Sequence, residues 1–458
     1  MRHYAGDREA TVVSERTPIA AFVRRYADEG AVRLHMPGHK GRGEMASHDI
    51  TEIPGADSLY EADGIIRESE RLTGELFGAY TLYSTEGSSL CIRAMLYLAK
   101  LQARRSAEPC RILAGRQAHK TFIGAAALLD IEVDWLYPSE DDGYLRCTVT
   151  AETVNDYLQN CDKKPTAIYL TSPDYLGGRT DISSIARVCH AHGVLLLVDN
   201  AHGAYLRFLP TSCHPISLGA DLCCDSAHKT LPCLTGGAYL HIQKGREDLY
   251  KHAREALALF GSTSPSYLIL SSLDTTQAAL ADGYGAAIAA LAACAEAAKE
   301  ELLAHGYTLV GDEPLKITLK TKPYGYTGDA LCASLRQAGF VCEFSDPDFV
   351  VMMLTPSLGE DVLPRLLEVL CAIPRRAPID APPPRFCRPQ RRMSAREALL
   401  SVHEILPVSA ALGRTLGAVT VGCPPAVPIL TMGEVVDAHA VEVFRYYGIP
   451  TVTVVKDV

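Results

Sequence analysis

The feature that most constrains the fold is an alternation of strand-like and helix-like stretches between about residues 66 and 245. Strands are predicted at 111–114, 131–136, 166–171, 193–199, 221–225 and 237–242, and helices at 87–104, 119–129 and 181–192. Strands that alternate with helices favour a mainly parallel sheet covered on both faces. The sequence therefore predicts an α/β fold with one large sheet domain.

The rest of the chain divides into smaller predicted parts. An alanine-rich stretch, 275–305, is interpreted as one long helix or two in tandem. A second α/β pattern follows, with strands at 315–320 and 349–354 and helices at 327–338 and 360–373. In chain order we predict an N-terminal arm with a short helix (1–48), a large domain (49–275), a small α/β domain (276–375), a Pro/Arg-rich linker (376–392) and a C-terminal domain (393–458).

The composition excludes two classes of partner. The chain has 458 residues, enough for two or three domains, and a formal net charge of −10. This charge leaves no basic surface for nucleic acid or for an anionic membrane. The N-terminus lacks a signal-peptide pattern, and no apolar run approaches the ~20 residues of a membrane span. We therefore expect neither a nucleic-acid nor a membrane partner.

The cysteines indicate the cellular compartment. There are fifteen of them without a Cys-x-x-Cys pair, and Cys223, Cys224 and Cys294 stand in apolar surroundings. Buried, reduced thiols that act as small hydrophobic side chains explain this pattern better than a disulfide scaffold. We therefore expect a cytoplasmic protein.

The segment with the most chemical information is 225–231 (DSAHKTL), which follows a predicted apolar strand. A lysine in this place, Lys229, lies at the carboxyl edge of the sheet, where open α/β folds bind their ligands. Lysine can form a Schiff base with an aldehyde cofactor when part of its population is neutral. Taken alone, the segment is more often a solvated loop with an ordinary lysine.

A second segment, 195–203 (LLLVDNAHG), places Asp199 at the end of another predicted strand. Pyridoxal-phosphate (PLP) chemistry needs an anion against the pyridine nitrogen, because a protonated ring is the better electron sink. An aspartate that ends a strand more often caps a loop. Together, Asp199 and the lysine 30 residues later give the order that a PLP site requires.

Three further segments could contact such a cofactor. Residues 84–89 (STEGSS) precede a predicted helix, whose first N–H groups could bind phosphate, although a plain helix cap is commoner. His119 follows a predicted strand and could stack on an aromatic ring, although an isolated histidine is usually a surface residue. The hydroxyl-rich turn 261–267 could contact phosphate or cap the next helix.

In these motifs the sequence resembles the PLP-dependent ornithine/lysine/arginine decarboxylases of bacteria, in a short form without an N-terminal wing domain. The resemblance covers nearly the whole chain. Its motifs are Thr17-Pro18, HMPGHKG (35–41), TEIPGADSL (51–59), TSP (171–173), DNAHG (199–203), SAHKTLP (226–232), STSPSY (262–267), SAREA (394–398) and PPAVP (424–428).

The resemblance implies a PLP-dependent transferase fold of the aspartate-aminotransferase type, with a sheet of the seven-stranded type in the large domain. It makes Lys229 the Schiff-base lysine and Asp199 the partner of the ring nitrogen, with His119 stacked on the ring. His202 is expected near the ring oxygen, and Lys229 or His228 would return a proton to the substrate. The expected phosphate contacts are Gly87, Ser88, Ser89, Ser226 and His228, with Ser262 and Thr263 reaching the neighbouring subunit's phosphate.

The implied reaction is decarboxylation of a basic amino acid, with arginine favoured over lysine and ornithine, in polyamine biosynthesis. The implied assembly is a homodimer or higher homo-oligomer with its site between subunits, and no metal is expected. The chain departs from the family's usual residues at Glu86, Asn200, Asp174, Tyr205 and Ala426. An anion such as Glu86 beside a phosphate weakens binding unless it points away.

Two other functions stay open. The first is another PLP reaction on the same fold, such as transamination or elimination. Aminotransferases bind the substrate's α-carboxylate with an arginine, for which Arg336 is a candidate by position. The second is a PLP-binding homologue with a regulatory role and no turnover, to which the departures give some weight.

Overall fold

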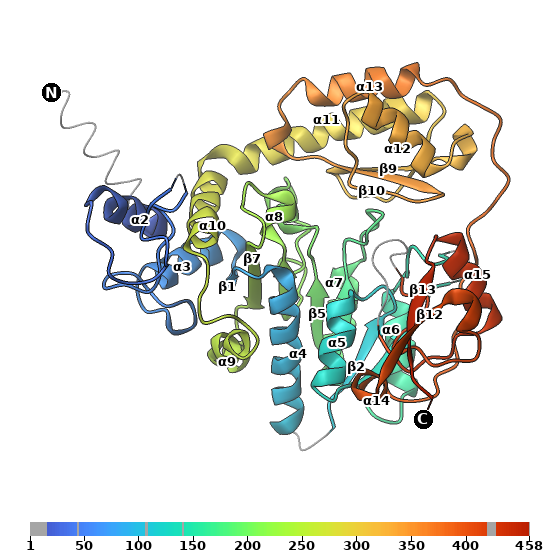
Figure 1. Ribbon diagram of the computed structural model, residues 1–458, viewed down its shortest axis with the longest axis horizontal. Helices are drawn as coiled ribbons and strands as arrows, with labels where there is room; N and C mark the ends of the chain where they lie inside the picture. The colour runs from blue at the N-terminus through green and yellow to red at the C-terminus, as the bar shows by residue number, and fades with distance from the viewer. Residues whose placement is uncertain (1–15, 44, 106–108, 140–141, 419–426, 458) are drawn as a thin grey trace. The chain divides into compact units, whose positions relative to one another are not determined.

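A computed structural model describes residues 16–43, 45–105, 109–139, 142–418 and 427–457 (Figure 1). The chain divides into two compact units, which are described in turn. The first unit contains Met1–Leu98 and Leu197–Ala289, and the second contains Ala99–Leu196 and Ala290–Val458. The predicted domain boundaries stay a prediction. Residues 424–426 of the predicted PPAVP motif lie outside the described residues.

The first unit begins with the predicted short helix, α2 (Pro18–Asp28), which buries one apolar face formed by Ile19, Ala20, Phe22 and Val23. A 3-10 turn (Leu59–Glu61) and α3 (Ile65–Phe77) follow. The Asp57 carboxylate accepts five backbone N–H groups, including that of Ile66 at 3.0 Å in the first turn of α3. Asp57 of the TEIPGADSL segment therefore organises this loop and caps the helix.

Four strands of the first unit build one side of a sheet in the order β1-β7-β6-β5. They are β1 (Ala79–Ser84), β5 (Leu195–Asp199), β6 (Leu222–Asp225) and β7 (Ala238–Gln243). Strands β5 and β6 are parallel, and Asp199 pairs with Cys224 at the end of their ladder. Both strands therefore end at the same edge, where their last residues are aspartates.

Several helices follow the strands of the first unit. Helix α4 (Gly87–Arg105) follows β1, and the one-turn helix α8 (Ala227–Thr230) follows β6. Helix α9 (Glu247–Ala258) leads to α10 (Tyr267–Ala279), a π turn (Leu280–Tyr284) and α11 (Gly285–Ala304). Asp282 and Gly283 have non-helical backbone angles, with φ +103° at the glycine, so the alanine-rich stretch forms two helices in tandem.

The second unit continues the sheet. Strands β2 (Arg111–Gly115), β3 (Glu132–Leu136) and β4 (Ala167–Thr171) are parallel neighbours in the order β4-β2-β3, with α5 (Lys120–Leu128), α6 (Ala151–Asn160) and α7 (Ile182–Ala191) between them. Strand β5 joins them through its first residues, because Leu195 N donates to Thr166 O at 3.2 Å. The sheet therefore has seven strands, of which β7 runs antiparallel to both its neighbours. The predicted α/β fold with a mainly parallel sheet is confirmed.

Two smaller sheets also belong to the second unit. An antiparallel sheet in the order β10-β11-β9-β8 contains β8 (Thr308–Val310), β9 (Lys316–Lys320), β10 (Phe344–Ser345) and β11 (Phe349–Met353), with α12 (Gly328–Gln337) and α13 (Val362–Ala372). Residues 376–390, all of them described, form neither helix nor strand. The end of the chain forms α14 (Ala395–Leu400), β12 (His403–Pro407), α15 (Ala438–Tyr446) and β13 (Thr451–Val455) around a core that includes Leu416, Phe444 and Val454.

Two expectations from the sequence need correction. Cys223 and Cys224 are buried as predicted, but Cys294 is exposed, because α11 buries the face that carries Ile288, Ala295 and Ala298. The helical segment Tyr267–Ala304 is long and apolar enough to span a membrane by length and composition, because an 18-residue window in it has a mean hydropathy of 1.5. The sequence analysis expected no such run. Alanines supply much of this hydropathy, and the break at Gly283 divides the segment.

Candidate active site

The buried apolar strand β5 delivers Asp199 to the carboxyl edge of the sheet. Its side chain is 2% exposed. Its Oδ1 accepts the backbone N–H of Ala201 at 3.2 Å, and the Sγ of Cys224 lies 3.6 Å from the same oxygen. A carboxylate held in this way can serve as a fixed anion at the sheet edge.

Lys229 lies in α8, directly after β6. Its backbone N–H donates to Ser226 O at 3.0 Å, which closes the turn, and its side chain is exposed. Its Nζ lies 3.1 Å from Nε2 of the buried His202. One proton lies between these two nitrogens, so one of them presents a lone pair. This contact favours proton exchange at the lysine, which a Schiff-base lysine requires.

Polar residues at the start of α4 lie next to residues of α8 and its N-cap. Ser226 Oγ donates to Ser88 Oγ at 2.8 Å, and Gly87 has φ +70° and donates its N–H to Gly236 O at 2.8 Å. His228 Nδ1 donates to Gly237 O at 2.9 Å, with its Cε1 4.0 Å from the position of a Cβ at Gly87. The structure therefore brings together predicted phosphate contacts from α4 and α8. Ser89 lies in the first turn of α4.

Glu86, the departure beside the phosphate segment, has a partner in the same unit. Its Oε1 accepts the backbone N–H of Ser262 at 2.6 Å. Ser262 Oγ in turn accepts the N–H of Ser264 at 3.1 Å, and the turn that includes Thr263 is exposed. The Glu86 carboxylate therefore points at the turn that begins at Ser262 in the same chain, and this hydrogen bond holds the turn in place.

The other residues named in the sequence analysis lie in the second unit or in the core. His119 caps α5 by accepting Thr121 N–H at its Nδ1 (3.2 Å), and its ring is exposed. Asp174 accepts Gly178 N–H at 2.7 Å and pairs with Arg146 at 3.1 Å, and burial raises its pKa. Arg336 is exposed near the end of α12, and Tyr205 is fully buried. The ring-stacking role of His119 stays a prediction.

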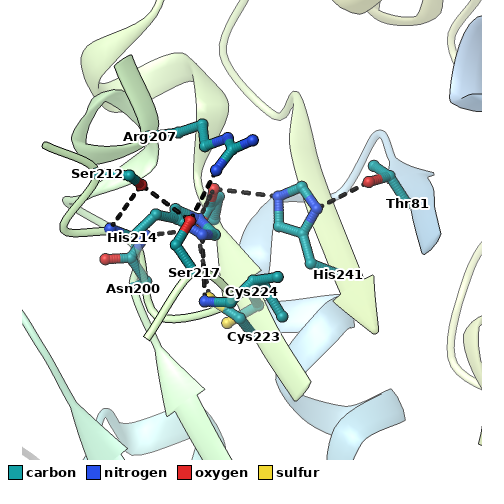
Figure 2. A network of polar contacts seen from close by, with 12 residues as sticks. Thr81, Asn200, Arg207, Ser212, His214, Ser217, Cys223, Cys224 and His241 are labelled. Atoms are coloured by element: carbon teal, nitrogen blue, oxygen red, sulfur yellow. Dashed lines mark hydrogen bonds and ion pairs between the residues drawn. The ribbon is translucent and has the colours of Figure 1, made fainter. Parts of the chain in front are cut away.

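Sequence reasoning missed a buried polar network next to this edge, centred on Asp225 (Figure 2). Its Oδ2 lies 2.9 Å from His214 Nε2 and 3.1 Å from His241 Nε2, and its Oδ1 accepts Asn200 Nδ2 at 2.7 Å. All four side chains are fully buried. The network joins residues that are distant in sequence, and the only sequence cue was a charged residue at the end of an apolar strand.

The ligand atoms of His214, Cys223 and Asp225 lie within 4.8 Å of one another, as in some metal sites. However, His214 Nδ1 accepts the backbone N–H of Ile216 at 3.3 Å, so its single proton is on Nε2. A metal ion needs the lone pair of that Nε2. The geometry therefore fits a hydrogen-bonded network, with His214 as a neutral donor to the carboxylate.

The charge of this network follows from its donors. Burial alone raises the pKa of Asp225, but the interactions with His214 and His241 outweigh it and hold that pKa well below its usual value. Burial lowers the pKa of His241. Asp225 is therefore a buried anion that accepts N–H groups from two imidazole rings and an amide.

With this geometry established, comparison with known proteins identifies the family. Residues 17–303 match the family described as Orn/Lys/Arg decarboxylase, major domain. The chain belongs to this family. The membership that the motifs predicted is thereby confirmed.

Curated relatives resemble nearly the whole chain. An arginine decarboxylase of Halalkalibacterium halodurans is 28% identical over 92% of this chain and 91% of its own length. The arginine decarboxylase of Bacillus subtilis is 27% identical, with coverage of 92% and 91%. Among solved structures, the constitutive lysine decarboxylase of E. coli matches with a TM-score of 0.78 at 17% identity, over 100% of this chain and 84% of that one. At this identity the structural likeness shows the fold alone, which this chain shares with that lysine decarboxylase.

Proposed function

We propose that the protein is a PLP-dependent decarboxylase that converts a basic amino acid, arginine in first place, to its amine and CO₂. The observation that carries the proposal is the placement of Asp199 at the end of β5 and of Lys229 in α8, just after the adjacent parallel strand β6, in a member of the Orn/Lys/Arg decarboxylase family. The curated relatives named arginine decarboxylase support the choice of arginine over lysine and ornithine.

The side chains at this edge fit PLP by their chemistry. An aldehyde needs an amine, which Lys229 offers with an exposed side chain. A phosphate needs hydroxyls and helix N–H groups, which Ser88, Ser226 and the first turn of α4 offer. A protonated pyridine needs a buried anion, which Asp199 offers.

When bound, PLP supplies an electron sink that weakens a bond to the substrate's Cα. Lys229 would hold the aldehyde, and Asp199 would face the ring nitrogen and keep it protonated. His202, 3.1 Å from Lys229 Nζ, would take or return the lysine's proton. His228 or Lys229 would return a proton to Cα, and His119 would lie against the ring.

We extend the proposal to the assembly and the setting. A homodimer would place the exposed turn with Ser262 and Thr263 against the partner's phosphate. The reduced cysteines suit the cytoplasm, and an amine product suits polyamine biosynthesis. The substrate is a small, cationic amino acid.

The test is a product panel on the PLP-loaded protein. Arginine, lysine and ornithine are supplied singly, and CO₂, amine and keto acid are measured. We expect CO₂ and amine in equal amounts, fastest from arginine, and loss of both in Lys229→Ala together with the visible absorbance of lysine-bound PLP. Keto acid without CO₂ would replace the proposal by transamination. Bound PLP with no product from any of the three would replace it by a non-catalytic role.

A further inference from the structure

We propose that Asp225 is a positioning residue that acts through Asn200 to fix the spacing between Asp199 and the segment of Ser226 and Lys229. The inference rests on the proposed function, because that spacing matters when one PLP molecule contacts both sides. Asp225 itself would touch neither cofactor nor substrate.

The contact between Asn200 and Asp225 lies where the two parallel strands end. Asn200 directly follows Asp199, and Asp225 directly precedes Ser226. The β5–β6 ladder ends with the pair Asp199 and Cys224. Beyond it, Asn200 N donates to Cys224 O at 3.0 Å, and Asn200 Nδ2 donates to Asp225 Oδ1 at 2.7 Å. One backbone hydrogen bond and one side-chain hydrogen bond therefore continue the pairing of strands β5 and β6 into the loops that follow them.

Hydrogen bonds hold the Asp225 carboxylate in one orientation. Two imidazole N–H groups, from His214 and His241, are directed at Oδ2, while Asn200 Nδ2 and the Sγ of Cys223 (3.6 Å) are directed at Oδ1. Each ring is held from behind. His214 Nδ1 accepts Ile216 N–H at 3.3 Å, and His241 Nδ1 lies 2.9 Å from Thr81 Oγ1 (Figure 2). The carboxylate therefore cannot rotate without the loss of several bonds.

The hydrogen bond from Asn200 to Asp225 is a strong one. The Asp225 carboxylate accepts N–H groups from both rings and from Asn200. Arg207, drawn in the same network, donates instead to Leu76 O (2.8 Å) and Ser217 Oγ (2.8 Å). A hydrogen bond to a buried anion is shorter and stronger than one between neutral groups. The 2.7 Å bond from Asn200 is of this charge-assisted kind.

The charge of Asp225 fixes the orientation of the Asn200 amide. Rotation of the amide would direct its oxygen at the Asp225 anion, which is repulsive. In the orientation with Nδ2 toward Asp225, Asn200 Oδ1 has no hydrogen-bond partner among the described residues. A Cβ at Gly203 would overlap this oxygen. Gly203, whose φ of −113° is ordinary, is therefore required for space rather than for backbone conformation.

The experiment exchanges the two ends of this bond. Asn200→Asp places a carboxylate against Asp225, and the double variant Asn200→Asp/Asp225→Asn restores one carboxylate–amide bond with its ends exchanged. The matched control is Asp274→Asn, a carboxylate equally buried in α10 of the same unit. For each variant the PLP dissociation constant is measured by absorbance titration, and the unfolding temperature is measured without PLP.

We expect Asn200→Asp to weaken PLP binding about tenfold or more, the scale of one charge-assisted hydrogen bond. The double variant should recover to within about threefold of wild type. Asp274→Asn should change the unfolding temperature but not PLP affinity. Wild-type PLP affinity in Asn200→Asp, or a failure of the double variant to recover while it is folded, would overturn the inference. Failure of the wild-type protein to bind PLP would instead overturn the proposed function.

Discussion

Two buried aspartates in the first unit have opposite protonation behaviour, although both are 0% exposed. Asp225, at the end of β6, lies beside His214 and His241, whose electrostatic attraction and hydrogen bonds outweigh burial and hold its pKa well below the usual value. Asp274, inside α10, accepts the Ala20 N–H at 2.9 Å and the Ser69 hydroxyl at 2.6 Å, and burial raises its pKa to about 6.

Both carboxyls accept hydrogen bonds, so the difference shows that the two histidines beside Asp225, rather than burial alone, separate the two pKa values. At neutral pH the protein maintains a buried anion next to the candidate active site. Asp274 in α10, which accepts the Ala20 N–H in the first turn of α2, takes up a proton at a higher pH than an ordinary aspartate.

The largest effect is expected for Asp225→Ala. This change leaves two imidazole N–H groups and one amide N–H buried without an acceptor, so the free energy of unfolding should fall by about 3–5 kcal/mol. Urea unfolding of the cofactor-free variant measures it. A loss below about 1 kcal/mol would show that these donors do not depend on the Asp225 carboxylate.

The next effect separates the two aspartates by pH. The pKa of Asp274 is raised from 3.8 to about 6, so its proton stabilises the fold below pH 3.8, and this contribution is lost as pH rises toward 6. Asp225, whose pKa is lowered, contributes in the opposite sense and loses its contribution as pH falls. Relative to wild type, Asp274→Asn should therefore gain stability as pH rises from 4 to 7, by up to about 3 kcal/mol. Urea unfolding at these two pH values tests this, and a pH-independent difference would contradict the assignment.

A smaller effect is expected for Gly203→Ala, which tests the Asn200 side of the contact. The added methyl group overlaps the Asn200 amide, so the variant should lose about 1–3 kcal/mol of stability and bind PLP more weakly. Gly193→Ala is a poor control because of its φ of +70°. Gly124→Ala in α5 has open space and serves as the matched change. Unchanged PLP affinity in Gly203→Ala would separate the glycine from the positioning role.

The smallest effect is expected for Glu86→Gln. This side chain is exposed, and glutamine keeps an oxygen for the Ser262 N–H while it removes a negative charge near the phosphate segment. The PLP dissociation constant should fall about two- to threefold, in keeping with an exposed charge. Titration at low and high salt measures it. A rise in the constant at both salt concentrations would show that the charge itself holds the Ser262 turn.

The sequence predicts the buried parallel strands well, because apolar runs such as 195–198 and 222–224 can hardly lie elsewhere. Strands β1 and β8 and helices α3, α6 and α9 were not predicted. Strand β1 lies at an antiparallel edge, and β8 has only three residues, so neither has the apolar pattern of a central strand.

The same limit applies to the site. Asp199 ends one strand and Lys229 follows the end of the next, and the apolar pattern reveals both strands, so their shared edge could be predicted. The Asp225 network could not, because His241 lies within a buried strand and His214 within a loop. Only the tertiary fold directs both rings at one oxygen.

The central claim is the covalent attachment of a cofactor to one lysine. The direct measurement is reduction of the PLP-loaded protein with borohydride, followed by proteolysis and mass spectrometry of the labelled peptide. The account predicts a single pyridoxyl label on Lys229. A label on another lysine, or no label in a folded protein that was saturated with PLP, would contradict it.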